Sequence, residues 1–352
     1  MTLKDADYLI TKKRVLVTGG AGFIGSNLCE VLLEQDNVVI CLDNFSTGYM
    51  HNIEDFLDNP KFKLIEGDIC VYEDCQKAVE DCDYVMHQAA LGSVPRSIEN
   101  PMKSTDVNIG GFVKILHAAA QAGVKRFVYA ASSSTYGDHS ELPKVEHRIG
   151  KALSPYAITK YVDELIAENF SQTYEIECVG LRYFNVFGRK QNVNGAYAAV
   201  IPKFVTQFMK GESPVINGDG SYSRDFTYID NVLQANQVAA ITNTEQVKKR
   251  QKKYYASIEK PTPNTKVLNE VINVACEERT NLVELASAVQ KNLVPFNDAI
   301  QEIEIKFGPN REGDIPHSLA SVTKGKLLFG YDPKIKIKQG LALSAKWYWD
   351  NL

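Results

Sequence analysis

The sequence lacks an apolar run that approaches the ~20 residues needed to span a bilayer, so no membrane partner is expected. Residues 1–13 are polar and charged without an apolar centre, which is not the pattern of a signal peptide. The seven cysteines are odd in number and include no C-x-x-C pair, which favours free thiols in a reducing compartment over disulfides or a zinc site. From these absences we expect a cytoplasmic protein without a metal ion.

The chain has no excess of positive charge either. A formal net charge of −4 argues against a nucleic-acid partner, but it is compatible with an anionic small ligand, since phosphate binding needs only a few local donors. One basic run, Lys248 to Lys253, lies within the polar stretch 243–266. This run resembles a nuclear-import or nucleic-acid signal. Nothing else in the chain supports that interpretation, so we predict a solvated surface insertion.

The 352 residues are 44% hydrophobic, which is enough for one large α/β domain and a smaller appended unit. In the first half, short apolar runs alternate with stretches of helical periodicity. The predicted strands are 15–17, 38–42, 62–65, 84–87, 127–131 and 178–181. The predicted helices are 24–34, 73–80, 102–122 and 157–172. Strands that are apolar on both faces and alternate with helices indicate an α/β, doubly wound parallel Rossmann sheet within residues 1–185.

Residues 186–352 are less regular and richer in proline and glycine. Helices are predicted near 198–210 and 230–241, and strands near 226–229 and 271–274. We therefore expect a smaller mixed α/β C-terminal domain, with roughly 226–242 returning to the first domain.

A glycine-rich segment joins the first predicted strand to the first predicted helix. Gly19, Gly22 and Gly25 allow a tight turn, a close approach of a pyrophosphate to the backbone, and close packing of the helix on the sheet. The helix N-terminus then offers unpaired N–H groups to the anion. Asp43 ends the second strand, where a carboxylate binds both ribose hydroxyls, and Asn44 rather than arginine follows it. This arrangement predicts NAD rather than NADP, although an aspartate at a strand end also caps ordinary turns.

Tyr156 and Lys160 form a Y-x-x-x-K pair just after Ser154 and Pro155, a typical helix start. A spacing of four residues places both side chains on one helix face. A free tyrosine has a pKa of about 10, so a base that works near pH 7 needs roughly 4 kcal/mol of phenolate stabilisation. An ammonium and a positively charged nicotinamide both stabilise phenolate. The pair alone is also compatible with an ordinary amphipathic helix.

Small hydroxyl residues, Ser132 to Thr135, directly follow the apolar run 127–131. Ligands of open α/β sheets bind at the carboxyl ends of the strands, where such hydroxyls reach a sugar oxygen. A turn rich in small polar residues is the alternative. The glycines, the acid, the serines and the Tyr/Lys pair in this order are more specific than any one of them.

Together these residues resemble the extended short-chain dehydrogenase/reductase family, and within it the UDP-hexose 4-epimerases. The resemblance runs nearly end to end. Its motifs are T-G-G-A-G-F-I-G (18–25), D-N-F-S-T-G (43–48), G-D-I (67–69), H-Q-A-A (87–90), V-N-I-G-G (107–111), S-S-S-T-Y-G (132–137), S-P-Y-A-I-T-K (154–160), R-Y-F-N-V-F-G (182–188), N-G-D-G…R-D-F (217–226) and R-E-G-D (311–314).

The resemblance implies two sets of ligand contacts. The NAD site would comprise Gly19, Gly22, Phe23, Ile24, Gly25, Asp43, Asn44, Phe45, Ser46, Thr47, Gly48, Asp68, Ile69, Gln88, Ala89, Ala90, Asn108, Tyr156, Lys160, Tyr183 and Val186. The UDP-sugar site would comprise Gly92, Ser93, Arg96, Ser132, Ser133, Ser134, Tyr156, Asn185, Ala199, Val200, Lys203, Arg224, Arg311, Asp314 and Ser318. The two arginines late in the chain suit a diphosphate as charge-assisted donors.

The same resemblance implies the catalytic roles. Ser132, which lies four residues before Tyr136, would bond the sugar O4 while Tyr156 removes its proton. Lys160 would hold the nicotinamide ribose and tune Tyr156. Hydride would pass from C4 to NAD⁺ and return to the other face of the resulting 4-keto sugar, so the cofactor supplies the hydride chemistry.

Sugar choice in this family follows a position shortly after the R-E-G-D motif, where a large tyrosine is associated with plain hexoses. Ser318 aligns with that position, and a small side chain leaves room for an acetamido group. The segment 195–203 also resembles the branch that acts on N-acetylhexosamines or their uronic acids. We therefore expect UDP-GlcNAc/UDP-GalNAc interconversion.

Three alternatives remain open. A 4,6-dehydratase normally carries an acidic pair where Ser134 and Thr135 stand here. A UDP-glucuronate decarboxylase or a uronate epimerase shares most of the motifs. A non-catalytic NAD-sensing protein of this fold would have lost the Tyr/Lys pair, which is present. Family members dimerise through two long helices, so we expect a homodimer built on 102–122 and 157–172.

Overall fold

The computed structural model describes residues 8–192, 199–309 and 316–352. Its centre is a seven-stranded sheet in which every pairing is parallel, in the order β11-β6-β5-β4-β1-β2-β3. The strands are β1 (Arg14–Thr18), β2 (Val38–Asp43), β3 (Phe62–Glu66), β4 (Tyr84–His87), β5 (Arg126–Ser132), β6 (Glu177–Tyr183) and β11 (Asn269–Val274). This sheet confirms the expected doubly wound α/β class.

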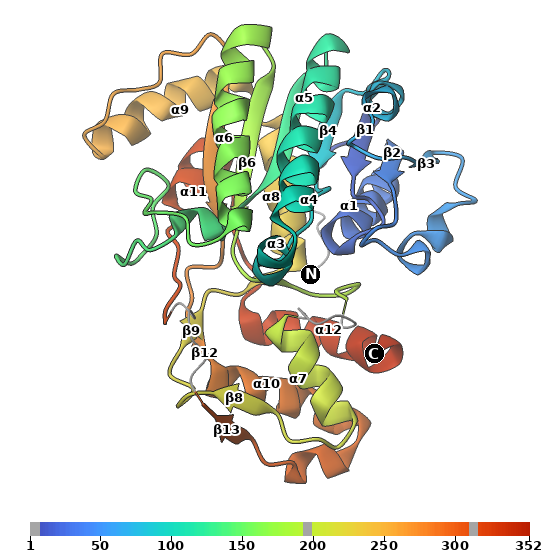
Figure 1. Ribbon diagram of the computed structural model, residues 1–352, viewed down its shortest axis with the longest axis vertical. Helices are drawn as coiled ribbons and strands as arrows, with labels where there is room; N and C mark the ends of the chain where they lie inside the picture. The colour runs from blue at the N-terminus through green and yellow to red at the C-terminus, as the bar shows by residue number, and fades with distance from the viewer. Residues whose placement is uncertain (1–7, 193–198, 310–315) are drawn as a thin grey trace.

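The apolar strands bury side chains on both faces of the sheet. In β1, Val15 and Val17 belong to one core cluster and Leu16 to another, because successive side chains point to opposite faces. One face is covered by α1 (Phe23–Glu34) and α8 (Ile229–Ile241). The other is covered by α2 (Tyr72–Val79), α5 (Phe112–Gln121) and α6 (Pro155–Tyr174), which stand side by side in Figure 1.

The strand order reverses between β1 and β4. The chain runs outward from β1 through β2 to β3, and then returns to build β4, β5 and β6 on the other side. Ligands of open α/β sheets bind in the crevice at such a reversal, beyond the carboxyl ends of the strands. Thr18, Asp43, His87 and Ser132 end four of these strands and so lie at this edge.

The expected helical stretch over roughly 102–122 is confirmed, but it contains a π-helical turn that the sequence does not predict. α3 (Val94–Glu99) and α4 (Pro101–Thr105) precede a π-helical turn at Asp106–Gly111, and α5 follows. The wide turn brings Gly111 against Ile69, where an added Cβ would lie 2.6 Å from the Ile69 side chain. Helical periodicity in the sequence does not reveal such a turn, since the apolar spacing continues through it.

The C-terminal half divides its elements between the sheet and a smaller unit at the bottom of Figure 1. β11 and α8 join the sheet. The smaller unit contains α7 (Val200–Met209), α10 (Leu282–Leu293), α12 (Ile337–Asn351), β8 (Val215–Asn217), β9 (Ser223–Arg224), β12 (Thr280–Asn281) and β13 (Lys306–Gly308). Between the units, β7 (Val186–Phe187) pairs with β10 (Thr227–Tyr228). Short 3₁₀ turns lie at Met50–Asn52, Glu54–Phe56, Ser133–Tyr136, Val294–Phe296 and Asp298–Glu302.

The polar stretch 243–266 is more ordered than the predicted surface insertion. Most of it forms α9 (Thr244–Ser257), which packs on α11 (Thr323–Phe329) and buries Val247 and Tyr254. A buried ion pair supports this packing, with Lys324 Nζ 2.6 Å from Glu270 Oε2. Lys249, Lys252 and Lys253 are exposed, whereas Arg250 donates to the carbonyl oxygen of Leu328 on α11 at 2.9 Å, so the basic run belongs to an amphipathic helix.

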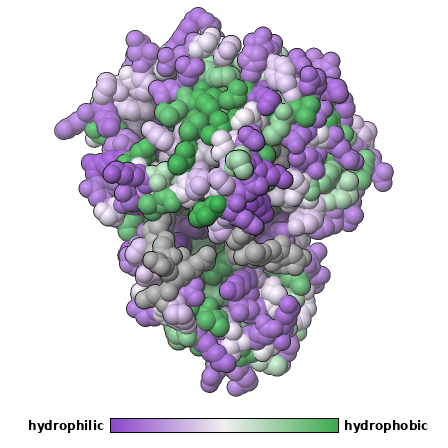
Figure 2. All heavy atoms as spheres, in the orientation of Figure 1, coloured by the Kyte–Doolittle hydropathy of each residue, from purple (hydrophilic) through white to green (hydrophobic). Residues whose placement is uncertain are grey.

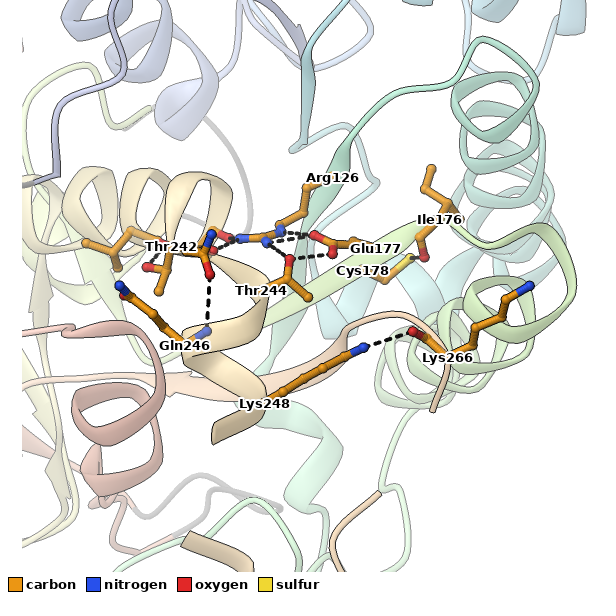
Figure 3. A network of polar contacts seen from close by, with 12 residues as sticks. Arg126, Ile176, Glu177, Cys178, Thr242, Thr244, Gln246, Lys248 and Lys266 are labelled. Atoms are coloured by element: carbon orange, nitrogen blue, oxygen red, sulfur yellow. Dashed lines mark hydrogen bonds and ion pairs between the residues drawn. The ribbon is translucent and has the colours of Figure 1, made fainter. Parts of the chain in front are cut away.

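Arg126, at the start of β5, fixes the junction between α8 and α9 (Figure 3). Its guanidinium donates to Glu177 Oε2 at 2.8 Å and to Thr244 Oγ1 at 2.9 Å. It also donates to two backbone carbonyls at the end of α8. Lys248 Nζ donates to the carbonyl oxygen of Lys266 at 2.9 Å. These contacts tie the basic helix to the sheet.

Across the described residues, no helix is long and apolar enough to cross a bilayer.

Candidate functional site

A cavity of about 440 Å³ lies at the carboxyl ends of the central strands. It brings together the segments that follow β1 and β4, the carboxyl ends of β2, β5 and β6, and the start of α6. Its lining includes these expected site residues: Gly19, Gly22, Phe23, Ile24, Gly25, Asp43, Asn44, Ser46, Thr47, Asp68, Ile69, Gln88, Ala89, Ala90, Gly92, Ser132, Tyr156, Lys160, Tyr183, Asn185 and Val186. Residues between Gly19 and Asn192, in the first part of the chain, therefore meet in one crevice.

The glycine turn forms one end of the cavity. Gly19 has φ +66°, and an added Cβ there would lie 2.8 Å from the backbone nitrogen of Ala89. A Cβ on Gly25 would fall on the carbonyl oxygen of Gly19 and 2.8 Å from Gly20 Cα. Gly22, as the N-cap of α1, has no side chain to bond the first amides of the helix. These amides are therefore available to an anion at the helix N-terminus.

Asp43 lines the cavity beside this turn, at the end of β2. Its carboxylate accepts hydrogen bonds from the backbone N–H groups of Ala21 (2.9 Å) and Phe45 (2.8 Å). Burial raises the pKa of Asp43, and these N–H donors oppose the effect. The carboxylate thus fixes the loop and keeps lone pairs for ribose hydroxyls. Among the lining residues that the structure describes, Lys160 is the only cation, so a 2′-phosphate beside Asp43 finds no partner. The donor set fits NAD.

Tyr156 and Lys160 enter the cavity from the first turns of α6. Ser154 caps this helix by accepting from the backbone N–H of Ala157 at 3.1 Å. The backbone N–H of Tyr156 donates to Ser97 Oγ at 3.0 Å, which ties the helix start to α3. The ammonium of Lys160 is buried and donates to the carbonyl oxygen of Ala130 on β5 at 2.9 Å. The pair is therefore held against the strand that carries the serine cluster.

Ser132 Oγ accepts two hydrogen bonds from Ser134, one from its backbone N–H (3.1 Å) and one from its hydroxyl (2.9 Å). A hydroxyl oxygen has two lone pairs and one proton. With both lone pairs occupied, the Ser132 proton is left to donate to an oxygen atom in the cavity. Ser134 acts here on Ser132 and does not itself line the cavity.

Tyr183 is the second tyrosine in the cavity, and its hydroxyl is already committed. It donates to Gln88 Oε1 at 3.1 Å and accepts from Asn236 Nδ2 at 2.9 Å. Burial raises the pKa of Tyr183 well above the usual value for a phenol. Tyr183 is therefore fixed as a neutral wall of the cavity, and Tyr156 is the other tyrosine of the described lining.

Several expected residues do not line this cavity. Asn108 instead links two segments of the cavity wall, because its side chain accepts a hydrogen bond from the N–H of Leu91 (2.8 Å) and donates one to Thr159 Oγ1 on α6 (3.1 Å). The expected residues outside the cavity are Phe45, Gly48, Ser93, Arg96, Asn108, Ser133, Ser134, Ala199, Val200, Lys203, Arg224 and Ser318. Arg311 and Asp314 lie outside the described residues. Ala199, Val200 and Lys203 lie at the start of α7 in the smaller unit. Arg224 lies on β9, and Ser318 is bonded to Ser223 of the same strand.

Two buried ionisable residues beside Lys160, Asp163 and His87, were not among the site residues expected from the sequence. Asp163 lies one turn further along α6, with Oδ2 3.2 Å from Lys160 Nζ. His87, at the end of β4, is buried against Phe127 and bonds Thr18 Oγ1 through Nδ1 at 2.8 Å. Burial and, secondarily, the charge of Lys160 lower the pKa of His87 to about 3. The spacing of Asp163, three residues after Lys160 on the same helix, is the sequence feature that could have indicated this contact.

Comparison with known proteins identifies the family of the chain. A profile described as the NAD dependent epimerase/dehydratase family matches residues 15–254. A putative UDP-glucose 4-epimerase of Methanocaldococcus jannaschii is 33% identical over 96% of this chain and 99% of its own length.

Two solved structures extend the comparison. A UDP-N-acetylglucosamine 4-epimerase from Methanobrevibacter ruminantium M1 in complex with UDP-N-acetylmuramic acid is 34% identical, with a TM-score of 0.83 over 97% of this chain and 100% of that one. A UDP-glucuronic acid 4-epimerase from Bacillus cereus, in complex with UDP-glucuronic acid and NAD, is 26% identical, with a TM-score of 0.76 over 95% of this chain and 98% of that one. The expected cofactor, NAD, is confirmed at the level of the family. The chain belongs to the NAD dependent epimerase/dehydratase family.

Proposed function

We propose that the chain is an isomerase that epimerises a UDP-sugar at carbon 4, with UDP-GlcNAc and UDP-GalNAc as its substrate pair. The observation that carries the proposal is the meeting of Ser132, Tyr156 and Lys160 in the cavity that also contains the glycine turn and Asp43. The relatives named as UDP-sugar 4-epimerases support the same reaction.

In the proposed mechanism, the phenolate of Tyr156 takes the proton from the sugar O4 and later returns it. Ser132 donates a hydrogen bond to the same oxygen. Lys160 would hold the nicotinamide ribose with its third ammonium donor, since Ala130 O and Asp163 take the other two, and its charge would stabilise the phenolate. Bound NAD supplies the acceptor and donor for the C4 hydride. Inversion at C4 would require the oxidised sugar to present its other face to the bound cofactor.

The preference for a neutral sugar rests on charge. Lys160 is the only cation among the described residues of the cavity lining, so a C6 carboxylate would find no second partner there. The test is to incubate the purified protein separately with UDP-GlcNAc, UDP-Glc and their uronic acids, and to resolve the products chromatographically. Interconversion of UDP-GlcNAc and UDP-GalNAc without net NAD consumption is expected. Release of CO₂, or turnover of the uronic acids alone, would favour the decarboxylase or uronate epimerase alternative.

The preference for the N-acetyl group is tested at Ser318. This half-buried residue donates its backbone N–H to Ser223 O at 3.0 Å, beside β9. In Ser318→Tyr, the ring would occupy the space that we assign to the acetamido group. The expected result is a loss of UDP-GalNAc turnover of about 10- to 100-fold, with UDP-galactose turnover retained or improved, measured as kcat/KM for each sugar. Equal effects on both sugars would contradict this assignment.

We also propose that the protein is a homodimer that uses the exposed apolar face of α3, α4 and α6. Ile98, Met102, Ile158 and Leu165 are 63%, 76%, 51% and 46% exposed, and their helices contact one another. Figure 2 shows apolar side chains gathered on the face that α5 and α6 occupy in Figure 1. Burial of such a patch against a second copy removes apolar surface from water.

Light scattering at micromolar concentration is expected to give twice the 39.2 kDa chain mass. The double variant Met102→Glu, Leu165→Glu is expected to give a monomer, since it places charges in the apolar face. Leu343→Glu, at an exposed leucine on α12, is the matched control and should remain dimeric. A monomeric mass for the unmodified protein would refute the dimer.

A further inference from the structure

The ammonium of Lys160 has a carboxylate partner that the proposed mechanism does not use. Asp163 lies three residues later on α6, and its Oδ2 is 3.2 Å from Lys160 Nζ. The side chains of the two residues are 2% and 0% exposed. Because burial reduces screening by water, the charge of the carboxylate acts on the lysine more strongly than it would in an exposed pair.

The hydrogen bonds around the pair leave one ammonium donor of Lys160 and one carboxylate oxygen of Asp163 without a protein partner in the described part of the chain. Lys160 has three donors, of which Ala130 O takes one (2.9 Å) and Asp163 takes another, so one remains for a ligand. The other carboxylate oxygen, Oδ1, is buried and has no hydrogen-bond partner in the described part of the chain. A carboxylate kept only for packing or fold stability would be expected to have both oxygens satisfied. The half-satisfied state leaves Asp163 with the lysine as its main partner.

Among the described residues packed around the pair, no other group duplicates this charge. Tyr129 on β5 is fully buried, and burial raises its pKa far above neutrality, so it stays neutral. His87 on β4 is neutral as well, because its pKa is lowered to about 3. Glu164, next on α6, is bound by Arg182 of β6 through two hydrogen bonds of 2.8 and 2.7 Å. Asp163 is therefore the counter-charge that faces Lys160.

We propose that Asp163 is a positioning residue that sets the working pH of the Tyr156/Lys160 pair, because its carboxylate and the Tyr156 phenolate share the charge of one ammonium. The inference rests on the proposed function of Tyr156 as the base. Two acids that share one cation titrate as a coupled set, so the ionisation of either one disfavours the ionisation of the other.

The direction of the effect follows from the charges. Burial raises the pKa of Asp163 to about 7, although Lys160 acts in the opposite direction. As the pH rises through this value, the carboxylate ionises and offsets part of the ammonium charge. The phenolate then gains less stabilisation from Lys160. The rise of kcat with pH is consequently expected to be shallow in the native protein. Its pH range should exceed that of a one-proton titration by more than one pH unit.

Asp163→Asn is the test, because it keeps the shape and the hydrogen-bonding oxygen but removes the charge. We expect the acidic limb of the kcat profile to move to lower pH by about half to one unit and to become a one-proton curve. Asp163→Glu restores the charge and should return the limb toward that of the native protein. The same shift is expected in the absorbance titration of phenolate near 295 nm in the NAD-bound protein, with Tyr156→Phe identifying the signal.

Controls separate tuning from stability. Glu270→Gln removes the carboxylate of the buried Lys324 pair, away from the cavity, and should lower the thermal midpoint without moving the pH profile. An Asp163→Asn profile that coincides with the native one would overturn the inference. If Asp163→Asn does not fold, a one-proton phenolate titration in the native protein overturns it equally. A phenolate shift in a protein that epimerises none of the sugars would uphold the inference and reject the proposed function.

Discussion

Tyr156→Phe is expected to lower kcat for UDP-GlcNAc epimerisation by roughly 10²- to 10⁴-fold, which is the usual contribution of a positioned acid/base. Phenylalanine keeps the ring that lines the cavity and removes only the hydroxyl that exchanges the O4 proton. The backbone N–H of residue 156 still donates to Ser97, so the helix start should be unaffected. KM and the thermal midpoint should therefore change little.

The measurement is the initial rate of product formation by chromatography, with thermal unfolding of the same samples. Tyr161→Phe, one residue beyond Lys160 on the exposed side of α6, is the matched control and should keep native kcat. Substantial activity in Tyr156→Phe would assign the proton transfer to another group. Tyr183 is poorly placed to replace it, because its hydroxyl is held by Gln88 and Asn236.

Gly25→Ala is expected to weaken NAD binding by about 10- to 100-fold or more, equivalent to about 1.4–2.8 kcal/mol. The added methyl group would overlap the carbonyl oxygen of Gly19, so α1 must move away from the turn that it packs against. The first amides of the helix then leave the position where they meet a pyrophosphate. A hydrogen-bonding anion site cannot tolerate such a displacement without a loss of affinity.

The affinity would be measured by calorimetry with NAD added to cofactor-free protein. Gly110→Ala is the control, since a Cβ there would meet only the flexible end of Lys114, 3.9 Å away. It tests whether any glycine-to-alanine change in this region has a similar effect. Native NAD affinity in Gly25→Ala would show that the glycine turn is not the pyrophosphate site.

The cofactor end of the site was predictable because its determinants are local. Gly19, Gly25 and Asp43 each sit at a strand end or helix start that apolar periodicity already indicates. Parallel strands present their carboxyl ends at one edge, so motifs scattered along the chain converge there without further information. The fold class followed from the same alternation, and β1 to β6 lie within a residue or two of their predicted bounds.

The remaining features depend on packing between distant elements. The π-helical turn at Asp106–Gly111 places Gly111 against Ile69, a contact between distant segments that no periodicity encodes. The burial of α9 depends on Glu270 and Lys324, which are distant in sequence from the basic run. The carboxylate of Asp163 looked like one more polar residue on an amphipathic helix until the structure placed it against Lys160. Sequence periodicity predicts which face of a helix is buried, but it does not predict which residues of other elements pack against that face.

The position of β11 limits how this protein can be divided. This late strand pairs with β6 over six residues and closes one side of the sheet. A truncated gene product that stops after β6 would present six ladder positions of unpaired backbone groups, a template for aggregation. Attempts to borrow the dinucleotide half as a stand-alone biosensor scaffold should therefore retain the returning strand, for instance by circular permutation.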